Sequence, residues 1–277
     1  MIRGKILKVN PAQDFNDDHP CVFILSTGRA GTETLAHLFH LAGNVFSYHE
    51  PSPKLYALSK IAYEKKQIYS ADKHLKDTLA EGFLTSRRDL LDYSLFCNRG
   101  YVETSPQVTF LAPIILDSIP NAKFIHLVRD PHEVVHSGMR RNWFNNNIYD
   151  KNRIIPIQGT EHAKIWDSLN PLNKNLWLWA ETNRWILKFA SNLNERNFLR
   201  VHSENIFNYD MRVIAQLFRF ISSKLPSEKR VNNILKKKYN KQRYGDFNDP
   251  ENWLDCLDDS IKKLVQSTSI ALDYEIK

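Results

Sequence analysis

The loop STGRAGTET, residues 26–34, combines the residue types that can hold an anion such as phosphate or sulfate. Its glycines permit a tight turn that points backbone N–H groups at a ligand, and its arginine adds a permanent positive charge. Its threonines offer hydroxyl groups, and a following helix would add the N–H groups of its first turn. The residues of this predicted anion site are Gly28, Arg29, Ala30, Gly31, Thr32, Glu33 and Thr34. For the loop taken alone, a purely structural turn with a surface arginine is an equally good interpretation.

Magnesium-dependent nucleoside triphosphatases carry a related loop, GxxxxGK[ST], from which this one differs. Thr32 and Glu33 follow Gly31 where that pattern requires Lys and then Ser or Thr. The difference disfavours such an enzyme. It leaves a P-loop-type nucleotide kinase or hydrolase with a degenerate loop as an alternative function.

A second segment, HLVRDPHEVVHS at residues 126–137, places Arg129 at the end of an apolar run and Ser137 eight residues later. In a helix that begins at the DP pair, Ser137 lies about 10 Å along the axis, at ~1.5 Å per residue. An extended arginine side chain and the serine hydroxyl could then converge on one anion. The alternative, favoured for this segment alone, pairs Arg129 with Asp130 or Glu133 and gives Ser137 no special role.

Both segments need buried strands to position them. Continuous apolar runs at 21–25 and 123–128 predict strands buried on both faces, and shorter strands are expected at 44–48, 101–103 and 198–201. Helical spacing covers 32–41, 108–116, 176–193, 206–221, 228–237, 254–272 and the residues from 131 onward, and more weakly 53–95. This alternation predicts an α/β fold with a P-loop-like central parallel sheet, helices on both faces and a single domain over residues 1–277. Such sheets bind ligands at the carboxyl ends of their strands, where both segments lie.

The chain carries a net charge of +7 and a pI of about 9.2, a balance that suits an anionic ligand or surface. Its densest basic cluster consists of Lys236, Lys237, Lys238, Lys241 and Arg243. Such a cluster alone is typical of a solvated face. A non-catalytic basic nucleic-acid-binding protein is therefore a second alternative function, although no recognised binding motif supports it.

Three widely separated cysteines, Cys21, Cys97 and Cys256, form neither a CxxC pair nor a disulfide framework. The segment MIRGKILKVNPAQDF lacks the apolar run of a signal peptide, and no stretch approaches the ~20 apolar residues of a membrane helix. These features predict a cytoplasmic protein without a metal site. A lumenal domain trimmed from its anchor is the alternative.

Taken together, the two segments resemble the PAPS-dependent sulfotransferase family, whose donor is 3′-phosphoadenosine 5′-phosphosulfate (PAPS). In that family the first loop holds the 5′-phosphosulfate, and a strand–RDP–helix segment with a later serine holds the 3′-phosphate. The resemblance implies that Arg29 and Thr32 bind at the first site, and Arg129 and Ser137 at the second. It also implies transfer of a sulfuryl group from PAPS to a hydroxyl, which releases 3′-phosphoadenosine 5′-phosphate (PAP).

The resemblance covers most of the chain. Further similar segments are YVETSP (101–106), NAKFIHLVRDP (121–131), FLRVHSENIF (198–207) and RYGDF (243–247). The last of them implies that Arg243 and Gly245 bind the nucleotide. Two positions depart from the pattern: many members carry Lys where Arg29 stands, and Ser or Thr is frequent where Glu33 stands.

An alcohol acceptor loses its hydroxyl proton as its oxygen attacks, so the resemblance implies a general base. The segment HEP resembles the base-bearing segment of several carbohydrate and protein sulfotransferases, which makes Glu50 the first candidate. Pro51 should hold the backbone of Glu50 extended. His49 is a second candidate, and Glu103 a third, in the region where the cytosolic hormone and phenol sulfotransferases place a catalytic histidine. The alternative role for Glu50 is to cap a helix that begins near Pro53.

Catalysis also requires that charge on the leaving phosphate be stabilised, which Arg29 and the loop N–H groups would do without a metal. The expected acceptor is a small-molecule, carbohydrate or lipid hydroxyl, and not a nucleic acid. Three tryptophans between residues 177 and 185 could stack on it, although large aromatic side chains are more often part of the core. The arginine pairs at 87–88 and 140–141 could bind an acidic acceptor or lie on ordinary surface.

Overall fold

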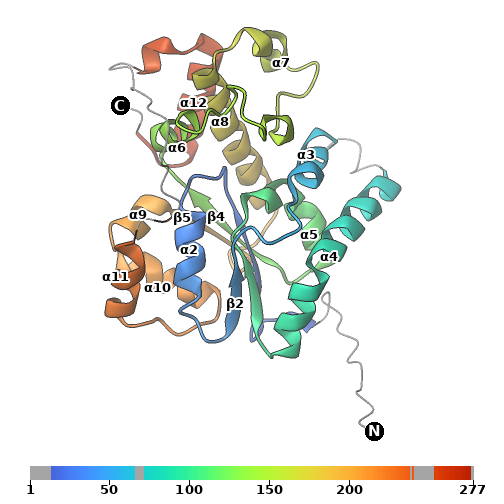
Figure 1. Cartoon of the computed structure of the whole chain (residues 1–277), viewed down its shortest axis with the longest axis vertical. Coiled ribbons are helices and arrows are strands. Elements are labelled where there is room, and N and C mark those ends of the chain that lie inside the picture. The colour runs from blue at the N-terminus through green and yellow to red at the C-terminus, as the bar shows by residue number, and fades with distance from the viewer. Residues whose placement is uncertain (1–13, 66–71, 238, 240–252, 276–277) are drawn as a thin grey trace.

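Five parallel strands form the central sheet of this computed structural model, which describes residues 14–65, 72–237, 239 and 253–275 (Figure 1). The strands are β1 Cys21–Leu25, β2 Val45–Tyr48, β3 Gly100–Glu103, β4 Lys123–Val128 and β5 Phe198–His202. Their order in the sheet is β2-β3-β1-β4-β5, and all four pairings are parallel. The predicted strands and their parallel arrangement are therefore confirmed. Chain order reverses on the two sides of β1, the place where ligands bind in open parallel sheets.

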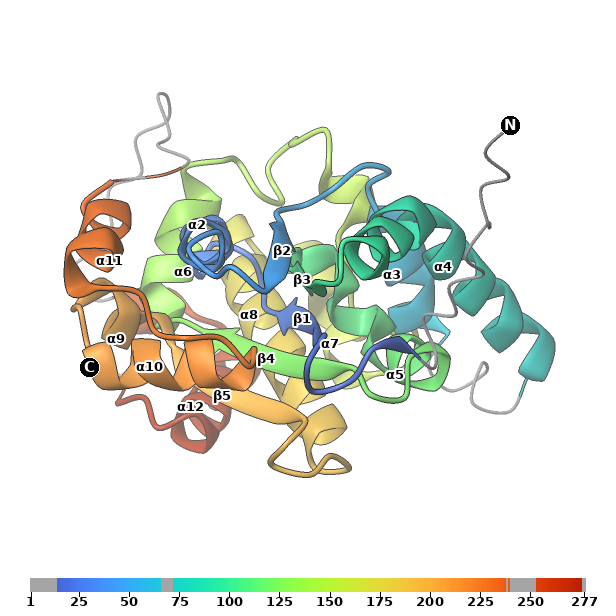
Figure 2. The same cartoon turned by 90° about the horizontal axis from the view of Figure 1, so that it is seen from below.

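The two faces of the sheet pack into two separate apolar clusters, as the continuous apolar sequence of β1 requires. Val22 and Ile24 point into one cluster, and Cys21, Phe23 and Leu25 point into the other. The first cluster is covered by α2 Thr32–Phe39, α10 Met211–Phe220 and α11 Glu228–Leu235. The second is covered by α3 Tyr56–Glu64, α4 Lys73–Phe96, α5 Ala112–Ser118, α8 Pro171–Ala190 and α12 Asp259–Ala271. Figure 2 shows α10 and α11 grouped on the side of α2, with α3, α4 and α5 on the opposite side.

Several helix boundaries differ from the sequence prediction, three of them at residues whose side chains cap a helix. The helix expected at 206–221 is split into α9 Ser203–Phe207 and α10, with Asp210 accepting a hydrogen bond from the N–H of Arg212. The helix expected at 108–116 begins as the 3-10 helix η1 Pro106–Leu111 and continues as α5. Helix α8 starts before residue 176, since Asn170 caps it, and α12 starts after Asp258, which caps its first turn.

The helix predicted from Pro131 is present as α6 Pro131–Met139, and Asp130 accepts from the N–H of Glu133 as its cap. Between α6 and α8 the chain forms three short helical turns: η2 Asp150–Asn152, α7 Glu161–Ile165 and η3 Trp166–Ser168. A further turn, η4 Trp253–Cys256, precedes α12. None of the described helices combines the length and apolar character that crossing a membrane requires.

Candidate active site

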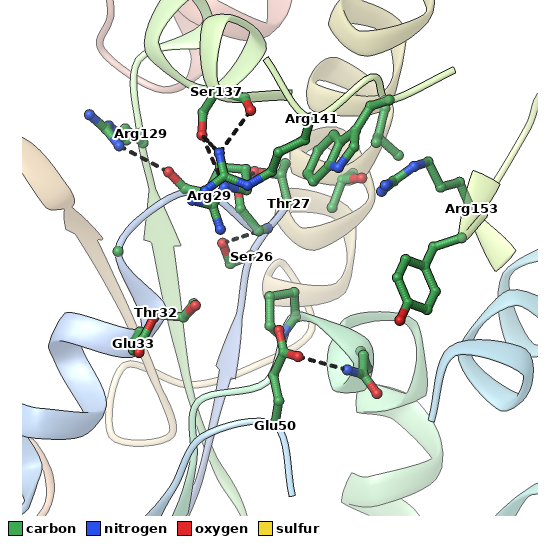
Figure 3. Close-up of a pocket in the computed structure, with 18 of the residues that line it drawn as sticks. Ser26, Thr27, Arg29, Thr32, Glu33, Glu50, Arg129, Ser137, Arg141 and Arg153 are labelled. Atoms are coloured by element: carbon green, nitrogen blue, oxygen red, sulfur yellow. Dashed lines mark hydrogen bonds between the residues drawn. The ribbon is translucent and has the colours of Figure 1, made fainter. Parts of the chain in front are cut away.

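A cavity of about 1180 Å³ opens at the carboxyl ends of the strands, between the β1–α2 loop and the segment that follows α6 (Figure 3). Among the described residues that line it, seven are lysine or arginine and only three are glutamate. The cations are Arg29, Lys60, Arg129, Arg140, Arg141, Arg153 and Lys237, and the glutamates are Glu33, Glu50 and Glu133. Low-dielectric walls carrying an excess of one charge concentrate ligands of the opposite charge. The cavity is therefore suited to an anionic ligand.

The β1–α2 loop is held in its turn by its own backbone and by η1. Gly28, Arg29 and Gly31 have φ of 79°, 59° and 95°, all in the left-handed region. Ser26 Oγ accepts a hydrogen bond from the N–H of Gly28 at 3.1 Å. The backbone N–H and carbonyl of Ser26 both bond to Thr109 Oγ1, each at 3.0 Å. These contacts fix the loop before any ligand arrives.

The N-terminus of α2 is open toward the cavity. Gly31 caps the helix without a side chain, and no side chain among the described residues takes its place, so the first-turn N–H groups are available to an anion. A Cβ on Gly31 would lie 2.7 Å from Phe207, so this turn has no room for a larger residue. Thr32 and Thr34 line the cavity with small exposed fractions, 6% and 8%.

Two of the loop residues predicted to bind the nucleotide are placed differently from their neighbours. Ala30 is fully buried in the α2 side of the core and does not line the cavity. Glu33 does line the cavity, but its carboxylate has the same sign as the ligand expected there. The contribution of Glu33 to an anion site is thus its backbone N–H in the first turn of α2.

The two sequence motifs meet at Ser137. Arg29 Nε donates a hydrogen bond to Ser137 Oγ at 3.0 Å, and Arg141 Nη1 donates to the same oxygen at 2.8 Å. A serine hydroxyl has two acceptor sites and one donor. Because both acceptor sites are occupied by guanidinium groups, the O–H of Ser137 is left to donate to a ligand. Ser137 thus joins the second motif to the first through Arg29, whereas Arg129, the arginine predicted to converge with it, has no hydrogen bond to Ser137 among the described contacts.

Arg129 combines the two alternatives that the sequence left open. Its Nη2 pairs with Glu133 Oε2 at 2.7 Å, as the structural interpretation required. Its Nη1 also donates to the carbonyl oxygen of Arg29 at 3.1 Å, and the side chain lines the cavity. Its guanidinium lies over the ring of Phe207 at 5.5 Å. Arg129 thus ties the end of β4 to the β1–α2 loop while facing the site.

The guanidinium groups of this arrangement repel one another, and the carboxylates of Glu33 and Glu50 offset that repulsion at Arg29 only in part. Burial lowers the pKa of Arg29 to about 10, and the charges of Arg141 and Arg129 add to the decrease. The pKa of Arg141 is lowered as well, by burial and by Arg140. A ligand with several negative charges would relieve both effects, since an opposite charge favours the charged form of a nearby group.

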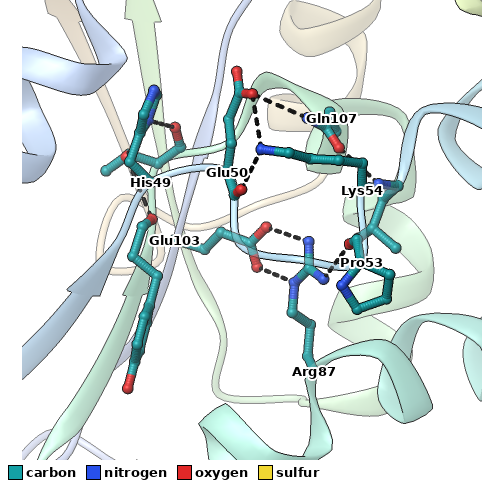
Figure 4. A network of polar contacts seen from close by, with 10 residues as sticks. His49, Glu50, Pro53, Lys54, Arg87, Glu103 and Gln107 are labelled. Atoms are coloured by element: carbon teal, nitrogen blue, oxygen red, sulfur yellow. Dashed lines mark hydrogen bonds and ion pairs between the residues drawn. The ribbon is translucent and has the colours of Figure 1, made fainter.

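Glu50 lines the cavity (Figure 3), and Figure 4 shows its polar contacts. Its Oε2 accepts from Lys54 Nζ and from Gln107 Nε2, each at 3.3 Å. Within the described part of the chain, the other oxygen, Oε1, has no hydrogen-bond partner. The expected extended backbone is wrong: Glu50 has φ of 43°, because the chain turns sharply there between β2 and the start of α3 at Tyr56.

His49 also lines the cavity. Its Nδ1 lies 2.9 Å from the carbonyl oxygen of Thr104 and 3.0 Å from Thr104 Oγ1. A carbonyl oxygen can only accept, so the tautomer that bonds to it carries its hydrogen on Nδ1 and leaves Nε2 as an acceptor. In that tautomer Nε2 could take a proton, with the ring held by a backbone contact.

Glu103 does not line the cavity, contrary to its prediction as a base. Figure 4 shows its carboxylate facing Arg87. Its carboxylate is fully buried and forms a two-point ion pair with Arg87, at 2.8 and 2.9 Å. Tyr101 also donates to it at 2.6 Å. Arg87 is equally buried and donates to the carbonyl of Pro53 at 2.9 Å. The pair is structural and anchors the segment that follows Glu50, so Arg87 is neither a surface residue nor an acceptor site.

Replacing Glu103 by glutamine should lower the free energy of unfolding by about 3 kcal/mol, because Arg87 would keep a buried charge without its partner. Urea denaturation measures this loss. The double variant Glu103→Leu/Arg87→Met removes both charges and should lose less. An active-site role for Glu103 would instead show as lost turnover in folded protein, with little loss of stability.

Several lining residues were not predicted from the sequence. Arg153, Gln107 and Phe207 come from separate segments that only the fold brings together. Arg141 was noted only as part of a basic pair. It lies in the turn just after α6, four residues after Ser137, and that spacing is the signal that could have found it. The tryptophans at 177 and 179 are fully buried in the core, as preferred for large aromatic side chains. Arg243 and Gly245 lie outside the described residues.

Among the described residues there is no cluster of three or more His, Cys, Asp or Glu side chains that could hold a metal ion. The polar groups around the cavity include guanidinium and hydroxyl donors, and the backbone N–H groups of the first turn of α2. Such donors bind anions directly, without an intervening cation.

The chain was compared with protein families, curated sequences and solved structures. A model described as the Sulfotransferase family matches residues 20–227, well over half of the chain. None of the curated protein sequences matches the chain.

Solved structures share the fold of this chain. The sulfotransferase domain from the curacin biosynthetic pathway has a TM-score of 0.55 at 18% identity, covering 94% of this chain and 99% of that one. The sulfotransferase domain from the Synechococcus PCC 7002 olefin synthase has a TM-score of 0.56 at 16% identity, covering 96% and 98%. A sulfotransferase from Alicyclobacillus acidocaldarius has a TM-score of 0.52 at 13% identity, covering 93% and 97%. At these identities the likeness concerns the fold.

Proposed function

This chain belongs to the sulfotransferase family, and on that premise we propose that it transfers a sulfuryl group from PAPS to a hydroxyl of its acceptor. Family and fold support sulfuryl transfer in general. The choice of donor is our proposal, as is the acceptor class of a small-molecule, carbohydrate or lipid hydroxyl. The cytoplasmic location and the single domain over residues 1–277 stay predictions.

The observation that carries the proposal is the contact between Arg29 and Ser137. It joins the loop after β1 to the helix after β4, so donors from both strand ends face one cavity. A ligand with an anionic group at each end matches this layout: the open α2 N-terminus with Arg29 suits one group, and Ser137 with Arg129 suits the other. PAPS has two such groups, its 5′-phosphosulfate and its 3′-phosphate.

When bound, PAPS would supply the sulfuryl group and leave as PAP once the acceptor oxygen has attacked the sulfur. Arg29 and the first-turn N–H groups of α2 are placed to stabilise charge that develops on the leaving phosphate. The loop that carries them is held by the contacts of Ser26 and Gly28, and the side chain of Arg29 is held by Ser137. The residues therefore need no rearrangement at the moment of transfer.

Glu50 is our candidate for the base that takes the acceptor proton. Its Oε1 is open, while Oε2 is held by Lys54 and Gln107. The acceptor O–H bond breaks as the new O–S bond forms, and the proton passes to the carboxylate oxygen. His49, whose Nε2 is an acceptor when Nδ1 carries the hydrogen, is the alternative base.

Nucleotide binding tests the donor assignment, and wild-type protein should prefer PAP to AMP. Ser137→Ala removes the hydroxyl hydrogen that Ser137 would donate to the 3′-phosphate, and should narrow that preference by about 10-fold, the scale of a hydrogen bond to a charged group. Arg129→Gln should narrow it further because a charge is lost. Titration calorimetry with both nucleotides gives the two affinities.

A second assay separates the alternative functions. Thermal stabilisation by PAP, by ATP with magnesium and by a DNA oligomer can be compared at equal excess, where 100 times the dissociation constant adds about 2.7 kcal/mol. We expect PAP to stabilise the protein most. The donor assignment would be refuted if ATP with magnesium, or DNA, stabilised the protein and PAP did not. Equal affinity for PAP and AMP would refute it as well.

A further inference from the structure

Arg153 lines the cavity but belongs to neither of the two motifs. It follows the turn η2 in the segment between α6 and α8. Figure 3 shows Arg153 on the far side of the pocket from Arg129, with Arg29 and Arg141 between them. The donors proposed to bind PAPS come from the ends of β1 and β4, so Arg153 needs a separate explanation.

The guanidinium group of Arg153 is held in a fixed orientation. It stacks on the ring of Trp143 at 3.9 Å, and its Nε donates to Asp150 Oδ1 at 2.9 Å. The carboxylate of Asp150 is itself fixed, since it accepts from the N–H of Phe144 and the N–H of Asn147, each at 3.0 Å. A guanidinium held in this way loses little entropy when it binds a further partner.

The remaining donors of Arg153 are available. Among the residues that the structure describes, neither Nη atom has a hydrogen-bond partner. Burial lowers the pKa of Arg153 despite the opposing effect of Asp150, so this one carboxylate does not compensate the charge fully. By contrast, Lys60 on α3 already donates to the carbonyl of Lys151 at 2.9 Å and lies 3.6 Å from Glu64.

The surroundings of Arg153 place it on the acceptor side of the cavity. Its turn packs against α3, the helix that follows the Glu50 segment. Burial and the charge of Glu50 raise the pKa of Tyr56, and Arg153 lowers it, so the Tyr56 phenol is within electrostatic range of both groups. Arg153 and Glu50 therefore face one shared space, lined also by Tyr149.

We propose that Arg153 binds an anionic group of the acceptor, a carboxylate or a phosphate or sulfate ester, and so selects a hydroxyl compound that is itself an anion. The inference rests on the proposed function, because it assumes that the acceptor hydroxyl lies at Glu50. A planar guanidinium with two open Nη donors suits two-point contact with such a group. The Trp143 ring behind it excludes water from one face of the contact.

The test uses small-molecule extract of the organism that encodes the chain. Anion exchange at neutral pH separates retained anions from neutral and cationic compounds. Elution in acid and then in salt separates carboxylates from phosphate and sulfate esters. Each fraction is incubated with the protein and ³⁵S-labelled PAPS, and the initial rate of label transfer is measured. We expect transfer to a retained fraction.

Three variants connect that rate to Arg153. Arg153→Gln should lower it about 10- to 100-fold at limiting extract, the range for one hydrogen-bonded charge. Arg153→Lys keeps the charge without the fork and should give an intermediate rate. The matched control is Lys151→Gln, which removes an exposed charge that does not line the cavity, and should label like wild type. PAP-induced thermal stabilisation should be equal in all four proteins, and it also reports that each is folded.

Each outcome decides between the two proposals. If only the unretained fraction is labelled, or if Arg153→Gln labels at the wild-type rate, the proposal of an anionic acceptor is overturned. The proposed sulfuryl transfer from PAPS would still stand. A wild-type protein that PAP does not stabilise and that labels neither fraction overturns both. If Arg153→Gln does not fold, the Arg153→Lys variant replaces it, and a rate equal to wild type in that variant counts against the proposal.

Discussion

Replacing Arg29 by alanine should lower turnover on the order of 1000-fold, the scale for losing a charged donor that stabilises a leaving phosphate. Arg29 is the one cation of the β1–α2 loop. Its Nε donates to Ser137. Its Nη1 and Nη2 atoms have no hydrogen-bond partner among the described residues, so they can donate to the ligand. The substitution also releases Ser137 from one of its two guanidinium contacts. Both proposed anion sites should therefore weaken together.

Turnover with PAPS and affinity for PAP should be measured in parallel for Arg29→Ala and Arg29→Lys. Lysine keeps a point charge but cannot contact Ser137 and a phosphate in the same planar geometry, so we expect partial activity. Arg212→Ala is a suitable control, because that arginine is on α10 with a side chain 92% exposed, and pairs only with Asp210 in the described structure. Normal turnover in Arg29→Ala would remove the β1–α2 loop from the site.

The local pattern of the sequence was sufficient to predict where the loops at the strand ends lie. A strand buried on both faces leaves an unbroken apolar run, and the turn that follows needs glycine where φ is positive. Those two signals located Gly28 and Gly31. The cap of α6 was equally local, with Asp130 accepting from a residue three positions later. The local pattern did not predict the hydrogen-bond or ion-pair partner of each polar side chain.

Glu103 illustrates that limit. The sequence around a glutamate at the end of a strand does not reveal whether its carboxylate faces a cavity or pairs with an arginine from a helix. Arg87, on α4, decides the matter by filling the space beside it. The same holds for Arg153, whose neighbours Trp143 and Asp150 are close in sequence, but whose position opposite Arg129 depends on how η2 packs on α3. Packing between distant segments, and not residue type, separates structural charges from functional ones here.

Glu50→Gln should lower turnover about 100-fold or more, the usual contribution of a general base. The substitution keeps the size and shape of the side chain and removes its basicity. Glutamine can still accept from Lys54 and Gln107 through its amide oxygen, so the turn between β2 and α3 should be preserved. Affinity for PAP should hardly change, because Glu50 is assigned to the acceptor.

The rival base is tested by His49→Asn under the same conditions. An asparagine amide can still donate to the carbonyl of Thr104, as Nδ1 of the histidine does, but it has no counterpart of the open Nε2. If Glu50 is the base, this variant should lose much less turnover than Glu50→Gln. Glu103→Gln completes the series as the variant in which stability falls and turnover of the folded protein stays close to wild type. Normal turnover in Glu50→Gln with an inactive His49→Asn would transfer the role to His49, and would leave Glu50 as a residue that shapes the turn.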